Sequence, residues 1–425
     1  MQDSGKPETG GEAALLRGVA VVGGGLAGLV AALALAARDV PVTLIAPRPD
    51  QSAMARDTRS TALFGPSLAM LARLGATAHL VGKMEGLRAL RLVDDTGGLF
   101  RAPEILFEAR EIGETAFGFN IENGPLIAAL TAEVDASSRV RWLPLAVESL
   151  ALDTEGAVLE LSDGAIATAR LVVAADGAQS RCRLAAGIAT SRWDYPQVAI
   201  ACRFAHERPH QGISTELHRR VGPLTAVPLA GAWSSLVWVE TAPEAERLMA
   251  LDDSAFAVEL GRHLGDIAGA IGALGPRASF PIAGVAAERM AGARVALVGE
   301  AAHKLPPIGA QGLNLGLRDA AWIADLAADA LARGSDPGGD DVLMAYERAR
   351  RPDVDSRVAL VDALNRSLLA DLLPFDVARG AGLAALKAIG PVRRLFMREG
   401  MRPAGPLPSL MRPLCATEAC GSALA

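Results

Sequence analysis

The residues from Gly18 to Ala46 read GVAVVGGGLAGLVAALALAARDVPVTLIA, and they limit the possible folds more than any other stretch. A short apolar run leads into a glycine-rich turn, an alanine- and leucine-rich segment follows, and a second apolar run ends the stretch. This order is typical of a βαβ unit, and the unbroken apolar runs indicate a parallel sheet that is covered on both faces. We therefore predict an α/β fold built on a Rossmann-like domain.

The three glycines of this turn, Gly23, Gly25 and Gly28, have separate roles in such a fold. The first permits the tight turn, the second lets the backbone approach a pyrophosphate, and the third lets the helix pack closely on the strand. The phosphates would lie against the free N–H groups at the positive end of the helix. The turn therefore predicts a dinucleotide site.

The second strand of such a unit usually ends in an acid that binds the adenosine ribose, and this chain has Ala46 there. Asp50 could replace the acid, or Arg48 could bind a 2′-phosphate as in an NADP-dependent dehydrogenase. The first motif alone therefore leaves the dinucleotide open.

Composition argues against several classes of function. The net charge is -6 and no long basic run occurs, so nucleic acid is not an expected partner. The four cysteines form no CxxC pair, which favours a reducing cytosol and no metal site. The uncharged stretch at 18–37 is not read as a membrane anchor, because an acidic tail precedes it and three glycines interrupt it. We expect a cytoplasmic protein.

The middle of the chain has a different pattern, in which apolar and polar residues alternate around Asp-Thr-Gly and Ser-Asp-Gly turns. This pattern predicts antiparallel hairpins inserted between segments of the parallel sheet. The predicted parts are a disordered tail at 1–17, a discontinuous cofactor-binding domain at 18–75, 105–183 and 280–350, a substrate domain at 76–104 and 184–279, and a C-terminal helical region at 351–425.

A second motif, LVVAADGAQSRCR, runs from Leu171 to Arg183. Its apolar strand ends at Asp176, and a carboxylate at the carboxyl end of a strand lies where open α/β sheets bind ligands. An ordinary Asp-Gly turn is the alternative, which the adjoining SRCR makes less attractive.

A third stretch, VGEAAHKLPPIGAQGLNLGLRDA, joins an apolar strand to an apolar helix. Glu300 follows the strand, where it could accept hydrogen bonds from ribityl hydroxyls. Pro306 and Pro307 stiffen the loop, and Gly309 and Gly312 let the backbone pass close to a ligand. The helix N-terminus would stabilise a reduced flavin, which is anionic near N1 and O2 of its ring. A connection without a ligand rarely needs this much unusual backbone.

These three stretches, in this order, resemble the flavin-dependent aromatic hydroxylases of the p-hydroxybenzoate hydroxylase type, and among them the ubiquinone-biosynthesis monooxygenases. The family signature GDAAH…P…GQGLNLGLRDA is similar to Gly299–Ala320, with Glu300 in place of the usual Asp and GAQG in place of AGQG. The family pattern ADGxxSxxR is similar to Ala175–Arg183, and DxRxxAL to Asp57–Leu63. The resemblance implies FAD as the cofactor, which answers the question left by Ala46. It also implies a Rossmann-like FAD-binding domain with an inserted antiparallel-sheet substrate domain and a C-terminal helical region.

The resemblance also implies roles for individual residues. The expected cofactor-binding residues are Gly23, Gly25, Gly28, Arg59, Asn123, Asp176, Glu300, Gly312, Leu313 and Asn314. The residues expected beside the reacting groups are Pro306, Pro307, Gly309 and His303. A structural role for His303 near the strand end is an equal alternative.

The implied reaction is hydroxylation of the ring of a polyprenylated phenol in ubiquinone biosynthesis. O2 adds to reduced FAD, and the flavin C4a-hydroperoxide donates oxygen while the protein excludes water. Electrons would come from NAD(P)H without a second Rossmann domain, or from a protein donor. The alternatives are a hydroxylase of a small soluble aromatic acid and a non-catalytic flavoprotein scaffold of a quinone-biosynthesis complex.

The segment at 367–403 mixes apolar clusters with cationic side chains. A segment of this composition could bind an anionic membrane surface, and such contact would bring the protein to a substrate that is expected to lie in the membrane. Packing on the protein's own core or on a partner is the equal alternative. The cations are Arg379, Lys387, Arg393, Arg394 and Arg398. The protein is thus expected in the cytoplasm, with a peripheral position on the inner face of the cytoplasmic membrane as an option.

Overall fold

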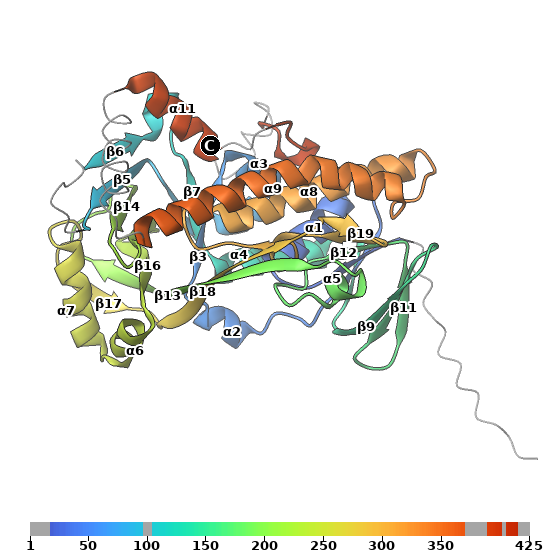
Figure 1. Cartoon of the computed structure of the whole chain (residues 1–425), viewed down its shortest axis with the longest axis horizontal. Helices are drawn as coiled ribbons and strands as arrows, with labels where there is room; N and C mark the ends of the chain where they lie inside the picture. The colour runs from blue at the N-terminus through green and yellow to red at the C-terminus, as the bar shows by residue number, and fades with distance from the viewer. Residues whose placement is uncertain (1–17, 97–103, 370–388, 402–404, 415–425) are drawn as a thin grey trace, which may run out of the picture.

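The βαβ unit expected at the N-terminus is present in the computed structural model, which describes residues 18–96, 104–369, 389–401 and 405–414 (Figure 1). Strand β1 (Val19–Val22), helix α1 (Leu26–Ala37) and strand β2 (Val42–Ile45) follow one another, and the two strands pair in parallel. Every residue of both strands is buried, as their unbroken apolar sequence predicts. The tail expected at 1–17 lies outside the described residues.

A six-stranded sheet grows from this unit in the order β19-β20-β12-β1-β2-β8. The added strands are β8 (Val140–Leu143), β12 (Leu171–Ala174), β19 (Ala291–Gly292) and β20 (Val295–Leu297). All pairings are parallel except that of the short edge strand β19. The beginning, middle and late parts of the chain therefore build one sheet, which confirms the predicted α/β fold. The carboxyl ends of β20, β12 and β1 lie side by side.

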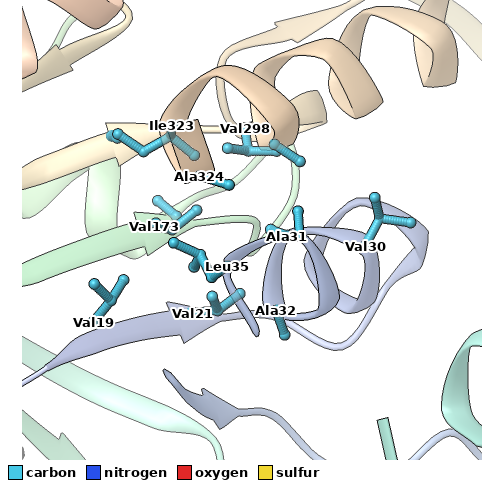
Figure 2. Close-up of a cluster of buried hydrophobic side chains, with 14 of the residues drawn as sticks. Val19, Val21, Val30, Ala31, Ala32, Leu35, Val173, Val298, Ile323 and Ala324 are labelled. Carbon is cyan, nitrogen blue, oxygen red and sulfur yellow. The ribbon is translucent and has the colours of Figure 1, made fainter. Parts of the chain in front are cut away.

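Helices cover this sheet, and small side chains let them approach it closely. Helix α1 packs against α8 (Gln311–Ala332) and α4 (Asn123–Ala136). Figure 2 shows side chains from β1, α1, β12 and α8 in one buried cluster, in which Ala31 and Ala324 occupy helix positions. The alanine-rich sequence thus reflects close packing of helices around the parallel sheet.

The inserted segments form a nine-stranded sheet in the order β21-β18-β13-β16-β15-β14-β5-β6, with β17 also paired to β13. All its pairings are antiparallel except that between β14 and β5. The strands are β5 (Ala89–Asp94), β6 (Ile105–Glu108), β13 (Thr190–His206), β14 (Ile213–His218), β15 (Leu224–Leu229), β16 (Trp233–Thr241), β17 (Ile271–Leu274), β18 (Ala278–Ala287) and β21 (His303–Lys304). Helices α6 (Ala242–Ala250) and α7 (Asp253–Leu264) lie on one face over a second core that contains Trp238 and Phe256.

This large sheet extends beyond the ranges expected for a substrate domain. Strand β6 falls in 105–183, and β18 and β21 fall in 280–350 or across its start, all assigned from sequence to the cofactor-binding domain. The expected boundaries therefore cut through a continuous hydrogen-bonded sheet. The predicted hairpins are present, since β5 pairs with β6 and β9 (Val147–Leu152), β10 (Ala157–Leu161) and β11 (Ile166–Ala169) form a separate antiparallel sheet.

A small sheet and one long helix connect the two large sheets. The small sheet has the order β3-β7-β4, with β3 (Ser60–Phe64), β4 (Met84–Gly86) and β7 (Gly118–Glu122). The long helix is α9 (Asp340–Leu369), which packs on α8 and extends toward β13 and β16 in Figure 1. There the Tyr195 hydroxyl donates to Asp362 at 2.5 Å. Helix α9 is thus fastened to both halves of the molecule.

The remaining helices are α2 (Gln51–Arg56), α3 (Gly65–Arg73), α5 (Arg181–Ala185) and α11 (Gly390–Met401). In the described part of the chain, no helix combines the length and the apolar character needed to cross a membrane.

Candidate cofactor site

The three sequence motifs meet at one edge of the six-stranded sheet. Gly23, Asp176 and Glu300 follow β1, β12 and β20, which are neighbouring parallel strands. Backbone hydrogen bonds continue the pairing past the strand ends, from Ala175 N–H to the Val22 carbonyl at 2.8 Å and from Val298 N–H to the Ala174 carbonyl at 2.9 Å. Open α/β sheets bind ligands at this carboxyl edge.

Two glycines of the first turn are required because a Cβ there would clash with the backbone, whereas a third has open space beside it. Gly23 has φ +115°, and a Cβ there would lie 2.2 Å from the Ala175 carbonyl oxygen. A Cβ at Gly28 would lie 1.9 Å from the Gly23 carbonyl oxygen. A Cβ at Gly25 would meet no atom within 4 Å. Of these three positions only Gly25, which is expected to face the pyrophosphate, is open. A ligand can therefore approach the backbone closely there.

The late glycine-rich stretch lies directly against the first turn. Gly299 has φ +62°, and a Cβ there would lie 3.0 Å from the Ala27 Cβ. A Cβ at Gly316 would lie 3.0 Å from the Gly299 Cα and 3.8 Å from the Ala27 Cβ. The residues that follow β20 therefore pack against the first turn of α1 and the second turn of α8. Two segments nearly three hundred residues apart in the sequence form one site.

Two helix N-termini open onto this region. Gly25 and Ala310 precede α1 and α8, and neither helix receives a side-chain cap. The first N–H groups of an α-helix have no partner within the helix, so they are suited to bind an electron-rich ligand. A Cβ at Gly312 would meet no atom within 4 Å, so the start of α8 is as open as the turn at Gly25.

The loop before α8 has the unusual backbone that its sequence predicts. Gly309 and Ala310 both have positive φ, 64° and 52°. Pro306 is buried, and Pro307 and Gly309 are exposed. Ala310 thus takes a left-handed conformation that costs a residue with a Cβ roughly 1–2 kcal/mol. Strain of this kind clusters at functional sites.

Asn314 and Leu313 lie in the first turn of α8, but the Asn314 side chain is committed elsewhere. Its Nδ2 donates to the Ala62 carbonyl at 2.9 Å, and its Oδ1 accepts from Phe64 N–H at 3.1 Å and Ser67 Oγ at 2.7 Å. The side chain therefore fastens α8 to β3 and α3. Any cofactor contact from this residue would come from its backbone.

Asp176 organises the second motif. Its Oδ1 accepts from the Ser180 hydroxyl at 2.5 Å and its Oδ2 from Cys182 N–H at 3.1 Å, which starts α5. Arg183 then donates to the Ala301 carbonyl at 2.8 Å. The second motif therefore supports the loop after β20, and a carboxylate retains acceptor capacity for a further ligand.

Arg59 and Asn123 lie together beside Asp57. The guanidinium of Arg59 donates to both Asp57 oxygens, at 2.8 and 2.7 Å, and Asn123 Nδ2 lies 3.4 Å from Asp57 Oδ2. Burial raises the pKa of the Asp57 carboxyl, but the hydrogen bonds from Arg59 and Asn123 outweigh it and lower the pKa below its ordinary value. The hydrogen bond to Asp57 raises the pKa of Arg59, and the charge of Glu300 adds to that rise. Glu300 itself is exposed.

His303 lies inside the protein, with 1% of its surface exposed. Its Nε2 is 2.7 Å from Asp319 Oδ2, and its Nδ1 has no partner among the described residues. The ring therefore does not line an open pocket, and we assign it the structural role that sequence left as an alternative. Sequence reasoning missed Asp319. The signal for it was an Arg-Asp pair inside an otherwise apolar stretch of helix.

The residues after β2, where sequence offered ligands for the ribose or a 2′-phosphate, make contacts within the protein. Ala46 is buried, and a Cβ at Gly24 would lie 2.9 Å from its Cβ, so the turn leaves little room for a larger side chain. Asp50 accepts from Ser52 N–H at 3.0 Å and caps α2. Arg48 pairs with Asp135 at 2.6 Å. Both alternative ligands for the ribose or a 2′-phosphate are thus engaged by other residues of the protein.

The residues at this edge fit FAD. An open glycine turn at an uncapped helix N-terminus suits a pyrophosphate, and an exposed carboxylate suits ribityl hydroxyls. A second uncapped helix N-terminus suits the electron-rich part of a reduced ring.

Comparison with known proteins gives the same cofactor. A family model described as "FAD binding domain" matches residues 145–360, and one described as "Glucose inhibited division protein A" matches residues 18–230. The first match covers half of the chain and includes the second and third motifs.

Relatives that match about nine tenths of the chain are named as hydroxylases of ubiquinone or its precursors. It is 37% identical over 394 residues to ubiquinone hydroxylase UbiL of Rhodospirillum rubrum, covering 92% of this chain and 91% of that protein. It is 28% identical over 385 residues to 3-demethoxyubiquinol 3-hydroxylase of Escherichia coli, covering 89% and 97%. The solved structure of p-nitrophenol 4-monooxygenase from Pseudomonas putida matches with a TM-score of 0.72 at 18% identity, over 92% of this chain and 100% of that chain. At that identity the match shows the fold alone.

Proposed function

The chain belongs to the family of FAD-dependent aromatic hydroxylases that includes the ubiquinone-biosynthesis monooxygenases, and we propose that it hydroxylates the ring of a polyprenylated phenol on the route to ubiquinone. The observation that carries this proposal is similarity to ubiquinone-pathway hydroxylases along nearly the whole chain. The same similarity disfavours a hydroxylase of a small soluble aromatic acid and a non-catalytic scaffold.

FAD, when bound, supplies the activation of O2 and the transfer of one oxygen atom to the ring. The protein binds and orients the reactants and excludes water. In this proposal the N-terminus of α1, at the open Gly25, binds the pyrophosphate. Gly23 and Gly28 bring the strand and helix close enough to present those N–H groups.

Glu300 is the proposed acceptor for the ribityl hydroxyls. Its side chain is exposed after the end of β20, next to Gly299, which packs against both α1 and α8. Its side chain is one methylene longer than that of the Asp usual in the family. Arg59 is close enough for the charge of Glu300 to raise its pKa. We expect Arg59, Asn123 and Asp176 to border the same cofactor.

The first turn of α8 is the proposed binding element for the reacting half of FAD. The N–H groups at Gly312, Leu313 and Asn314 would stabilise negative charge on the reduced ring. Pro306, Pro307 and Gly309 would form the wall beside that ring, where a rigid loop excludes water. His303 supports this loop from inside and takes no part in the chemistry.

The antiparallel sheet supplies the proposed neighbour of the substrate. Phe280 on β18 is partly exposed, and its ring centroid lies 5.6 Å from the Arg59 guanidinium carbon. An aromatic side chain therefore stands where the large sheet borders the cofactor residues. Such a surface suits the apolar face of a phenol ring. Reducing equivalents would come from NAD(P)H or a protein donor.

Helix α11 is the part of the C-terminal region that favours peripheral membrane contact. Its inner face packs Met397 against the cluster of Ile105 and Phe107. Its outer face exposes Val392 and Leu395, at 45% and 60%, together with Arg394 and Arg398. Apolar side chains beside cations suit an anionic lipid surface or a partner in a quinone-biosynthesis complex. Arg379 and Lys387, part of the same expectation, lie outside the described residues.

The reaction itself can be tested with the purified full-length protein. Incubation with FAD, NADH or NADPH, and a phenol carrying a short prenyl chain should give a product with one added oxygen atom. A flavin-free preparation is the control. If only small aromatic acids stimulate NAD(P)H oxidation and gain oxygen, the soluble-substrate alternative replaces this proposal.

A further inference from the structure

Asp319, on the second half of the late motif, is completely buried and holds two different elements. Its Oδ2 accepts from Gly299 N–H at 3.1 Å and faces His303 Nε2 at 2.7 Å. Its Oδ1 accepts from Arg350 Nε, on α9, at 2.7 Å. One carboxylate therefore joins the loop after β20 to helix α9.

The two Oδ2 contacts bracket the segment that carries Glu300. Gly299 stands immediately before Glu300, and His303, three residues after Glu300, begins strand β21. Between them, the Ala301 carbonyl accepts from Arg183. The backbone on both sides of the exposed Glu300 is thus fixed by buried hydrogen bonds, and the side chain projects from a clamped loop.

The carboxylate is itself held by a chain of buried charges. Arg350 also donates to Asp353 at 2.8 Å, and Asp353 receives two hydrogen bonds from Arg318, at 2.9 and 2.7 Å. A buried ion costs several kcal/mol of solvation unless partners compensate it. These partners let Asp319 stay ionised, so both of its oxygens act as acceptors toward the loop and toward α9.

The ionised Asp319 also sets the hydrogen on His303. An ionised carboxylate only accepts hydrogen bonds, so His303 must carry a hydrogen on Nε2. This fixes the ring plane and holds the strand β21 end in place. The histidine acts through Asp319 and the backbone, in agreement with its burial.

We propose that Asp319 is a positioning residue for the cofactor, which fixes the Gly299–His303 loop so that Glu300 reaches the ribityl chain. This inference rests on the proposed function, because it assumes that Glu300 faces FAD. It predicts that loss of the Oδ2 contacts weakens FAD binding more than loss of an equally buried charge that does not touch the loop.

The matched variants are Asp319→Asn and Asp353→Asn. In Asp319→Asn, the remaining oxygen stays with the charged Arg350, and the amide NH2 turns toward Gly299 N–H, which loses its acceptor. Asp353 belongs to the same network and is also buried, and its carboxylate pairs with Arg318, Arg350 and Arg357. Comparison of the two separates loop positioning from general loss of stability.

The measurement is the dissociation constant for FAD, from quenching of flavin fluorescence on titration into flavin-stripped full-length protein, with the melting temperature of each variant alongside. We expect Asp319→Asn to weaken FAD binding by about ten-fold more than Asp353→Asn at comparable loss of melting temperature. Equal weakening by both variants, or unchanged binding by Asp319→Asn, would overturn the proposal.

A second pair keeps the test informative if Asp319→Asn does not fold. His303→Gln places an amide N–H near the position of Nε2 and should bind FAD within about three-fold of the wild type, while His303→Leu should lose about ten-fold. Equal affinities for the two variants would contradict positioning through Asp319. Because these readouts need no substrate, they stay separate from a failure of the hydroxylation assay, and wild-type protein that binds no FAD would instead refute the proposed function.

Discussion

A Cβ on Gly316 would lie 3.0 Å from the Cα of Gly299, so helix α8 and the end of β20 touch backbone to backbone. This contact brings the late motif against the first glycine turn, since Gly299 also faces Ala27 of α1. The position of Glu300 and of both helix N-termini depends on this close approach.

Alanine at the glycines of the first turn should separate folding from cofactor binding. Gly28→Ala places a methyl group 1.9 Å from a carbonyl oxygen and should lower the free energy of unfolding by at least about 2 kcal/mol. Gly25→Ala meets no atom, so the flavin-free protein should keep its stability while FAD binding weakens. Urea unfolding and flavin titration of both variants measure the two effects. A large stability loss in Gly25→Ala would show that this glycine serves packing instead.

The strained residue before α8 predicts a stabilising substitution. Ala310 has φ +52°, which glycine adopts without a Cβ penalty, so Ala310→Gly should raise the free energy of unfolding by about 1 kcal/mol. Gly309→Ala, at φ +64°, should lower it by a similar amount. Thermal denaturation of both variants checks the pair. A lower melting temperature for Ala310→Gly would contradict the assignment of strain to this residue.

The carboxylate of Glu300 should matter for FAD binding and not for folding. Glu300 is exposed, so Glu300→Ala should leave the melting temperature of flavin-free protein unchanged and weaken FAD binding by about ten-fold. Glu300→Asp restores the residue usual in the family and should retain most of the affinity. If Glu300→Ala binds FAD as the wild type does, the ribityl contact lies elsewhere. Full pathway function in a flavin-free Glu300→Ala protein would instead favour a scaffold.

Protonation of the buried Asp319 at low pH should destabilise the folded protein. Burial raises the pKa of this carboxyl, but attraction to Arg350 and His303 and their hydrogen bonds outweigh burial and lower the pKa from 3.8 to about 2. A carboxyl with a lower pKa in the folded state stabilises the protein above the unfolded value. The stabilisation, about 2 kcal/mol, is therefore present above pH 4 and lost as the pH falls toward 2.

The comparison for this prediction is Asp319→Asn, which has no carboxyl to titrate at that position. Urea unfolding between pH 5 and pH 2 should show a steeper loss of stability in the wild type than in the variant. Parallel curves would mean that Asp319 titrates alike in both states, against the buried network described here.

Backbone requirements made much of the fold and site predictable from sequence. A Cβ at Gly23, Gly28 or Gly299 would lie too close to a neighbouring atom, so the presence of glycine in the sequence already indicates close packing there. The apolar runs of β1, β12 and β20 likewise specify strands covered on both faces. The resemblance to FAD-dependent aromatic hydroxylases is confirmed by the family match and by relatives that cover about nine tenths of the chain.

Side-chain partners were less predictable, because they depend on contacts between distant segments. Asn314 fits the family signature, yet its side chain binds β3, 252 residues away. Asp319 has the charge of a surface residue, and only its contacts with Gly299, His303 and Arg350 explain its burial. The large sheet also spans the ranges expected for two domains, since β6 and β18 pair with strands of the expected substrate domain.

Hydroxylation of a polyprenylated phenol on the route to ubiquinone is tested most directly by mass spectrometry of quinone intermediates in a strain that lacks the protein. We predict accumulation of a prenylated precursor that lacks one ring oxygen, with ubiquinone restored by the wild-type gene and not by a variant that cannot bind FAD. Normal ubiquinone and no accumulated precursor in the deletion strain would show that the protein does not have this function.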